Sequence, residues 1–391
     1  MEDFRQIPNV NAHLHTPFSF SAFDKLTDAL DKAKAEDVKI AGINDFYSMD
    51  GFVEWKNESL KRNIYPLFNI EWISLRKEDQ ENGIRVNDPN NPGRTYISGK
   101  GLCCPPRLRQ PYASQLARIR SKSNAMVKEM CNKVNERLYA INAGFAIHYS
   151  EIENDFSKGL VRERHLAKAL RMSIHTRFEN KPDDIAAFIE NLFNGKPLES
   201  NVFDSAGVEN EIRRVLFKSG GMAFVQEDPN AFLPMEDVCQ IILEVGGIPT
   251  YPFLGDDATG RFTEFETDIE KTVDTLKQCG IFSAEFITTR NSIELLEKYA
   301  GYLLENGFIV TFGSEHNTPV MEPVKLSARN NVPLTEKLKK INYEGACIIA
   351  AHQERMRMGQ QSYIDANGIA VIEQKEQFFK EGHALIQKVI N

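Results

Sequence analysis

The feature that most constrains the fold is that successive apolar segments of the N-terminal region each run into polar side chains that can bind a metal. The three segments are Ile7–Val10, Lys39–Ile43 and Tyr65–Ile70, and they lead to His13 and His15, to Asp45 and to Glu71. Two stretches with helical spacing, 24–37 and 52–62, separate them. This alternation predicts parallel strands joined by helices, a class in which sites are built at the carboxyl ends of the strands.

His13 and His15 stand on alternate residues directly after the first apolar segment. On a strand, residues two apart point to the same side, so both imidazoles can face one point. Paired neutral imidazoles are good ligands for a divalent metal. The spacing alone is also consistent with two packed histidines, so the interpretation depends on what the other strands supply.

The pattern changes twice along the chain. Long amphipathic helices dominate residues 112–232, and strand–helix alternation resumes in residues 233–325 before a helical tail, 326–391. We therefore predict an α/β fold in which residues 1–111 and 233–325 form a barrel of alternating strands and helices. Residues 112–232 form a helical insertion between two barrel strands, and the tail is a separate helical segment.

Further polar residues follow the later strands. They are Tyr251, Glu285, Glu315 and His316. In a closed barrel, these side chains and the earlier ones converge on one mouth. Two histidines with two carboxylates suit Zn²⁺, Mn²⁺ or Fe²⁺.

Simpler interpretations remain open for several of these residues. Glu71 is consistent with a strand that ends in water, Asp45 with a helix N-cap, and the Gly313–Glu315 stretch with an ordinary turn. His165 is consistent with a solvated helix face. Arg290, which follows a strand end, can bind an anion or pair with a nearby acid.

Composition narrows the class of protein. The net charge of −8 comes without a basic stripe, which argues against a nucleic-acid partner. No apolar run approaches the length of a membrane span, and the acidic start is unlike a signal peptide. The six cysteines form no C-x-x-C pair. We expect a reduced, cytoplasmic protein.

The order of these motifs resembles that of the PHP (polymerase and histidinol phosphatase) family of metal-dependent phosphoesterases. His13–Leu14–His15 resembles its opening H-x-H, Ala41–Asp45 its T-D-H strand, and Asn69–Glu71 its G-x-E. Gly247–Pro252 resembles its A-H-P region and Gly313–Glu315 its closing G-S-D-x-H. Within the insertion, Arg164–Ala167 resembles a segment of the subgroup that hydrolyses small nucleotide phosphates. The matches span residues 5–320 and imply a distorted seven-stranded barrel.

The chain departs from the family at specific ligand positions. Family members hold up to three metals, and by the resemblance one site is kept here by His13, His15, Glu71 and Glu315, with Glu in place of the usual Asp. The histidines of a second site correspond to Tyr96 and Tyr251. The ligands of a third correspond to Phe20, Phe46 and Asn317. Aromatic rings of Phe and Tyr do not replace neutral imidazole on a divalent metal.

The resemblance therefore implies a metal-dependent hydrolase with a single divalent ion, acting on a small phosphorylated or sugar-like molecule. Asp45 and His316 are the candidate proton-transfer residues. The candidate substrate-binding residues are Arg164, His165, Arg290, Tyr96 and Tyr251. The alternative is a barrel that has lost catalysis and serves as a binding or regulatory module.

Overall fold

The computed structural model describes residues 7–257, 259–365 and 368–391. Among the described residues, seven strands follow one another around a curved sheet in the order β1-β2-β3-β4-β6-β7-β8, and a short eighth strand, β5, pairs with β3. The seven strands are β1 (Asn9–Leu14), β2 (Val38–Phe46), β3 (Tyr65–Leu75), β4 (Arg94–Lys100), β6 (Ile248–Phe253), β7 (Ser283–Ile287) and β8 (Ile309–Gly313). β4 is antiparallel to both of its neighbours, and the other pairs are parallel.

The first and last strands come together and nearly close the barrel. The His15 amide donates to the Glu315 carbonyl at 2.8 Å, and the Glu315 amide donates to the His13 carbonyl at 3.0 Å. Gly313 allows this approach, because a Cβ there would lie 2.2 Å from the Cβ of His13. The predicted distorted (β/α)7 barrel is confirmed.

Helices cover the outside of the barrel. They are α1 (Leu26–Ala35), α2 (Phe52–Leu60), α3 (Lys77–Glu81), α9 (Met235–Glu244), α10 (Ile269–Gln278) and α11 (Ile293–Glu305). The apolar positions of α1 show why: Leu26, Ala29, Leu30 and Ala33 recur at helical spacing and are all buried. Three strands of two residues each complete the set, β5 (Leu233–Pro234), β9 (Ser327–Ala328) and β10 (Val332–Pro333).

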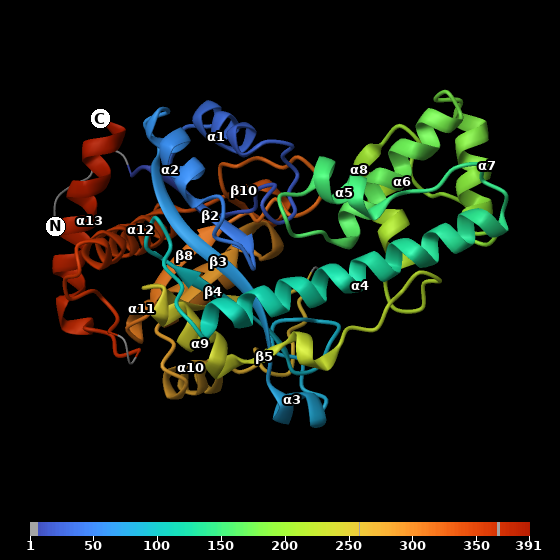
Figure 1. The fold of residues 1–391 in the computed structure, drawn as a ribbon. Coiled ribbons are helices and arrows are strands. Elements are labelled where there is room, and N and C mark those ends of the chain that lie inside the picture. Colours follow the sequence, from blue (N-terminus) through green and yellow to red (C-terminus); the bar gives the residue numbers. More distant parts are fainter. Residues whose placement is uncertain (1–6, 258, 366–367) are drawn as a thin grey trace.

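The segment between β4 and β5 is helical, as predicted, and lies beside the barrel (Figure 1). It contains α4 (Tyr112–Ala140), α5 (Tyr149–Phe156), α6 (Glu163–Arg177), α7 (Pro182–Leu192) and α8 (Ser205–Ile212). These helices enclose a hydrophobic core of their own, whose buried residues run from Val127 to Ala223. Figure 1 shows α4 extending from the barrel to the far end of this segment.

The C-terminal segment covers the end of the barrel opposite to the histidines. It consists mainly of α12 (Glu336–Arg357) and α13 (Lys375–Ile390). Buried residues from the start of the strands, such as Val10, Leu67 and Ile309, share one core with α12. We call this end, where α12 packs against those residues, the floor of the barrel.

Two buried amides of α12 bond to the strands at the floor. Asn342 donates to the Val10 carbonyl at 3.1 Å and accepts from the Phe312 amide at 2.8 Å, which joins β1 to β8. Gln353 bonds in the same way to the Pro66 carbonyl and the Phe68 amide, each at 3.2 Å. These side chains pair backbone groups that would otherwise be buried without a partner. No helix among the described residues is long and apolar enough to cross a bilayer.

Candidate metal centre

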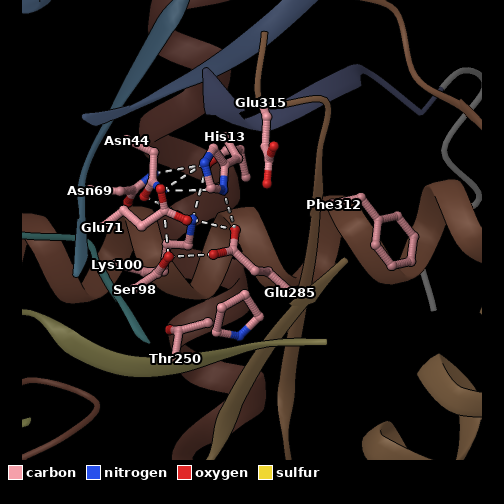
Figure 2. A network of polar contacts seen from close by, with 12 residues as sticks. His13, Asn44, Asn69, Glu71, Ser98, Lys100, Thr250, Glu285, Phe312 and Glu315 are labelled. Atoms are coloured by element: carbon pink, nitrogen blue, oxygen red, sulfur yellow. Dashed lines mark hydrogen bonds and ion pairs between the residues drawn. The ribbon is translucent and has the colours of Figure 1, made fainter. Parts of the chain in front are cut away.

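Three side chains meet at the mouth of the barrel, the end at which the parallel strands finish. Figure 2 shows two of them, His13 and Glu71. The Nε2 atoms of His13 and His15 are 3.3 Å apart, and Glu71 Oε2 lies 3.4 Å from His15 Nε2. All three residues are buried. A tetrahedral site with ligands about 2.0–2.1 Å from the metal has edges of roughly 3.3–3.4 Å. The spacing of the three donors therefore fits a divalent metal ion.

Local structure explains how these side chains reach the mouth. β1 carries a register irregularity between Asn11 and Leu14, which oppose Ala41 and Ile43 of β2. Such bulges re-aim side chains next to sites, and this one lies at His13. Glu71 does not mark a strand that ends in water, because β3 continues to Leu75 and pairs with β4.

The hydrogen bonds of His13 fix its tautomer. Its Nδ1 lies 3.0 Å from Glu285 Oε2. Although burial opposes ionisation, Lys100 and His13 hold the pKa of Glu285 well below its ordinary value. An ionised carboxylate can only accept, so Nδ1 carries the hydrogen and Nε2 presents a lone pair.

The tautomer of His15 is fixed through two further residues, Ser19 and Asp45. Its Nδ1 lies 3.2 Å from Ser19 Oγ, and that hydroxyl donates to Asp45 Oδ1 at 2.6 Å. The Ser19 oxygen is therefore free to accept from Nδ1, which leaves a lone pair on Nε2. Burial lowers the pKa of His15 and so favours the neutral ring.

Three atoms with lone pairs thus face one another, and the Asn44 amide nitrogen also lies 3.0 Å from His13 Nε2. Burial raises the pKa of Glu71 to about 8, so without a cation this carboxyl keeps a proton near neutral pH. A divalent cation satisfies all three donors at once. The chemistry of the donor set, and not only its spacing, suits a metal.

Glu315 lies next to this group but outside it. Its Oε2 accepts a bond from Arg290 and one from Asn317, the latter at 2.5 Å. Burial would raise the pKa of Glu315, but Arg290 and the two histidines hold it below the ordinary value. Of the two options left open for Arg290, the structure shows the pairing with a nearby acid. The role of Glu315 as a fourth ligand stays a prediction.

The two candidate proton-transfer residues have their polar atoms engaged. Asp45 lies within β2 and accepts from the Thr16 amide, the Thr16 hydroxyl and Ser19, and burial raises its pKa to about 6. His316 has Ser314 Oγ at 2.8 Å from Nδ1 and the Glu322 carbonyl at 2.9 Å from Nε2. Asp45 thus connects to His15 through Ser19, whereas His316 lies apart from the three donors.

The two candidate tyrosines lie on opposite faces of the sheet. Tyr96 is two residues from Ser98, which bonds to Glu285 inside the barrel, so Tyr96 shares the inner face. Tyr251 pairs with Ala284 and so shares its face, opposite to Glu285. Its hydroxyl donates to Glu266 Oε1 at 2.9 Å, and its ring is fully buried. The structure therefore does not bring Tyr251 to the donors.

A cavity of about 660 Å³ lies where the helical segment meets the barrel mouth. Phe20 and Asn317 line it from the barrel, and Arg164 and His165 line it from α6. His165 is not on a solvated helix face: it is buried, its Nδ1 accepts from the Arg162 amide at 3.0 Å, and burial lowers its pKa to about 4. Arg164 forms no ion pair within the described part of the chain and one hydrogen bond, to Asn210.

The structure shows how Phe20 and Phe46, the residues at third-site positions, are packed, and it adds Arg162, which the sequence did not single out. Phe20 stacks on the His15 ring at 5.0 Å and contacts Phe46, and the Arg162 guanidinium lies over both phenyl rings. Rings thus fill the place where the resemblance puts a third metal site. Lys100 was also missed. It lies inside the barrel, fully buried and paired with Glu285 at 2.5 Å.

The comparisons with known proteins find likeness in structure only. Neither the models of known families nor the curated proteins match the sequence. One similar structure is an amidohydrolase from Chromobacterium violaceum, solved with bound sulfate and no metal. It has a TM-score of 0.54 and 17% identity, and the match covers 85% of this chain and 96% of that one.

A second similar structure is a protein from Bifidobacterium adolescentis described as a metal-dependent phosphoesterase. Its TM-score is 0.54 at 15% identity, and the match covers 86% of this chain and 96% of that one. At such low identity the likeness establishes the fold. The chain shares its barrel fold with these two proteins, consistent with its resemblance to the PHP fold.

Proposed function

We propose that this chain is a metal-dependent hydrolase that uses one divalent ion, Zn²⁺, Mn²⁺ or Fe²⁺, to cleave a small anionic molecule at the barrel mouth. The observation that carries the proposal is the convergence of His13, His15 and Glu71 at 3.3–3.4 Å with both ring tautomers set to face inward. The fold shared with a phosphoesterase and an amidohydrolase supports the same class of reaction.

Three protein donors leave a coordination position open, as in catalytic zinc sites with two histidines and one glutamate. A bound ion would lower the pKa of a water molecule and polarise the scissile group. Glu315 would be the candidate fourth ligand: Arg290 and Asn317 both bond to its Oε2, so its other carboxylate oxygen would be the one to bind the ion. The aromatic cluster of Phe20 and Phe46 supports one ion instead of several.

The charges around the cavity support an anionic substrate. Lys168 pairs with Asp24 and Arg171 pairs with Glu209, each at 2.7 Å, so these two cations are compensated. Arg164 is the lining cation without a carboxylate partner among the described residues, and it is largely buried. A guanidinium in that setting suits a phosphate or carboxylate. The sulfate in the amidohydrolase structure shows that a protein of this fold holds a tetrahedral anion.

A second candidate function follows from the position of Phe20. Its ring stacks on His15 and also lines the cavity, so it narrows the route from the cavity to the donors. This favours a binding module that retains an anion without cleaving it.

The test begins with metal analysis of the purified protein beside the His13→Ala/His15→Ala variant, followed by hydrolysis assays on phosphomonoesters. We expect about one equivalent of metal, lost in the variant, and hydrolysis only with metal. Arg164→Met should raise KM by about 10–150-fold, since a charged hydrogen bond contributes about 1.5–3 kcal/mol. The exposed Arg214→Met is the matched control. Anion binding without metal or turnover would establish the binding module instead.

A further inference from the structure

Lys100 is an unusual residue for the interior of a barrel. It ends β4, the antiparallel strand, and both its side chain and that of Glu285 are fully buried. A buried ammonium is costly unless it is paired and hydrogen-bonded. Lys100 meets that condition with three contacts: Glu285 Oε2 at 2.5 Å, Asn44 Oδ1 at 3.1 Å and the Ala12 carbonyl at 3.3 Å.

Each of these contacts leads to His13. Glu285 accepts from His13 Nδ1 at 3.0 Å. The Asn44 amide nitrogen lies against the ring, 3.1 Å from Nδ1 and 3.0 Å from Nε2, and Ala12 directly precedes His13 in the chain. Figure 2 shows Lys100, Glu285 and Asn44 grouped around the His13 ring. Because Asn44 Oδ1 faces the ammonium, its nitrogen is directed toward the ring.

We propose that Lys100 is a positioning residue of the metal centre. Its ammonium holds Glu285 and Asn44 in the arrangement that orients the His13 ring, with Nε2 toward His15 and Glu71. This inference rests on the proposed metal-dependent function and adds a residue to which neither the motifs nor the family resemblance assigns a role.

The charges explain why the pair matters more than either member. A lone fixed cation near the donors would repel a metal ion, and a lone buried carboxylate would be left without its counter-charge. Together Lys100 and Glu285 are neutral, so they orient His13 without opposing the metal. Removing one member should therefore weaken metal binding by more than the loss of its own contacts would, because the other charge is left unpaired. Removing the second member as well should weaken metal binding little further.

The experiment measures the Kd for Co²⁺ by titration, together with the visible absorption spectrum of the bound ion. The variants are Lys100→Met, Glu285→Gln and the double variant. Outer-shell partners of metal ligands typically contribute 10–100-fold in affinity, so we expect each single variant to weaken Co²⁺ binding by about that factor and to alter the spectrum. The double variant should lose no more than the weaker-binding single variant, because Lys100 acts through Glu285.

Unchanged affinity and spectrum in Lys100→Met would overturn the inference, and so would losses that multiply in the double variant. Glu285→Gln keeps the shape of the side chain and serves if Lys100→Met does not fold; an unchanged Kd in that variant also overturns it. Lys375→Met is the control, a partly buried lysine that bonds to the Phe308 carbonyl and should leave Co²⁺ binding unchanged. Failure of the wild-type protein to bind Co²⁺ would contradict the proposed function itself.

Discussion

The buried polar groups at the two ends of the barrel differ in the hydrogen-bond partners that the chain gives them. At the floor, Asn342 and Gln353 of α12 pair backbone groups of the strands, and each amide both donates and accepts. At the mouth, His13, His15 and Glu71 direct acceptor atoms at one another. The floor is satisfied by the chain itself, whereas the donor atoms at the mouth suit the cation proposed above. Under the proposed function, stability and metal binding depend on different ends of one sheet.

The Glu71→Gln variant should give the largest effect and is the strongest test of this difference between the two ends. If each ligand contributes about 3–4 kcal/mol to metal binding, the variant should bind several hundredfold more weakly. Hydrolysis should fall with metal occupancy, while the metal-free protein stays folded. Metal titration and calorimetry of the same samples check both parts. A variant that keeps its metal would mean that Glu71 is not a ligand.

At the floor, Asn342→Leu should have the complementary effect. It leaves the Val10 carbonyl and the Phe312 amide without their partner, at a cost of about 2–3 kcal/mol in the free energy of unfolding. Metal affinity should not change. Chemical unfolding measures the first quantity, and Lys340→Ala on the exposed side of α12 is the control. Loss of metal binding with little loss of stability would reverse the assignment of the two ends.

The pH dependence of stability distinguishes the ends further. In the metal-free protein the pKa of Glu71 is raised to about 8, so the folded state binds a proton more tightly than the unfolded state, whose value is about 4.3. The stability due to this group is present at low pH and is lost as pH rises through 8, by up to about 1.4 kcal/mol per unit. Glu71→Gln lacks this loss.

Unfolding of both proteins in EDTA at pH 5.5 and 7.5 therefore gives a difference that grows with pH in favour of the variant. A constant difference would show that Glu71 is ionised in the metal-free fold.

The smallest expected effect comes from Ser19→Ala, which removes the hydroxyl that links Asp45 to His15 by hydrogen bonds. The ring loses the acceptor that fixes its tautomer, and metal affinity should fall about tenfold, at the low end for such partners. Ser59→Ala is the matched control, since that buried hydroxyl has no partner among the described residues. Equal Kd values for the two variants would show that Ser19 does not hold the ring.

Much of this arrangement followed from the sequence, because the alternation of strands and helices is local. The sequence placed His13, His15, Glu71 and Glu315 at one mouth, and in the structure the first three lie within reach of one another with Glu315 next to them. The sequence did not predict on which face of the sheet each side chain lies. Tyr251 lies on the outer face because inward and outward positions alternate, so a shift of one residue reverses the assignment.

The sequence did not indicate a role for Lys100, for a related reason. It stands in an antiparallel strand whose pairing with β3 and β6 depends on contacts far apart in the chain. Its partner Glu285 is 185 positions away by residue number, and no short pattern signals that the two will meet. The aromatic cluster of Phe20 with Phe46 and Arg162 likewise unites a loop, a strand and a helix cap.

The separate core of the helical segment has a consequence for how this protein can diversify. The buried residues of its own core, from Val127 to Ala223, pack among themselves. Leu116, Ile119 and Leu160 belong instead to the barrel core, so an exchange of the segment between related chains would have to match the contacts of these three residues. The cavity lies at the junction, with Arg164 on one wall and Phe20 on the other. Recombination at that boundary would keep the reaction and change which molecules are admitted to it. In such a recombinant protein, the substrate selectivity would come from the chain that supplied the helical segment, and the reaction from the chain that supplied the barrel.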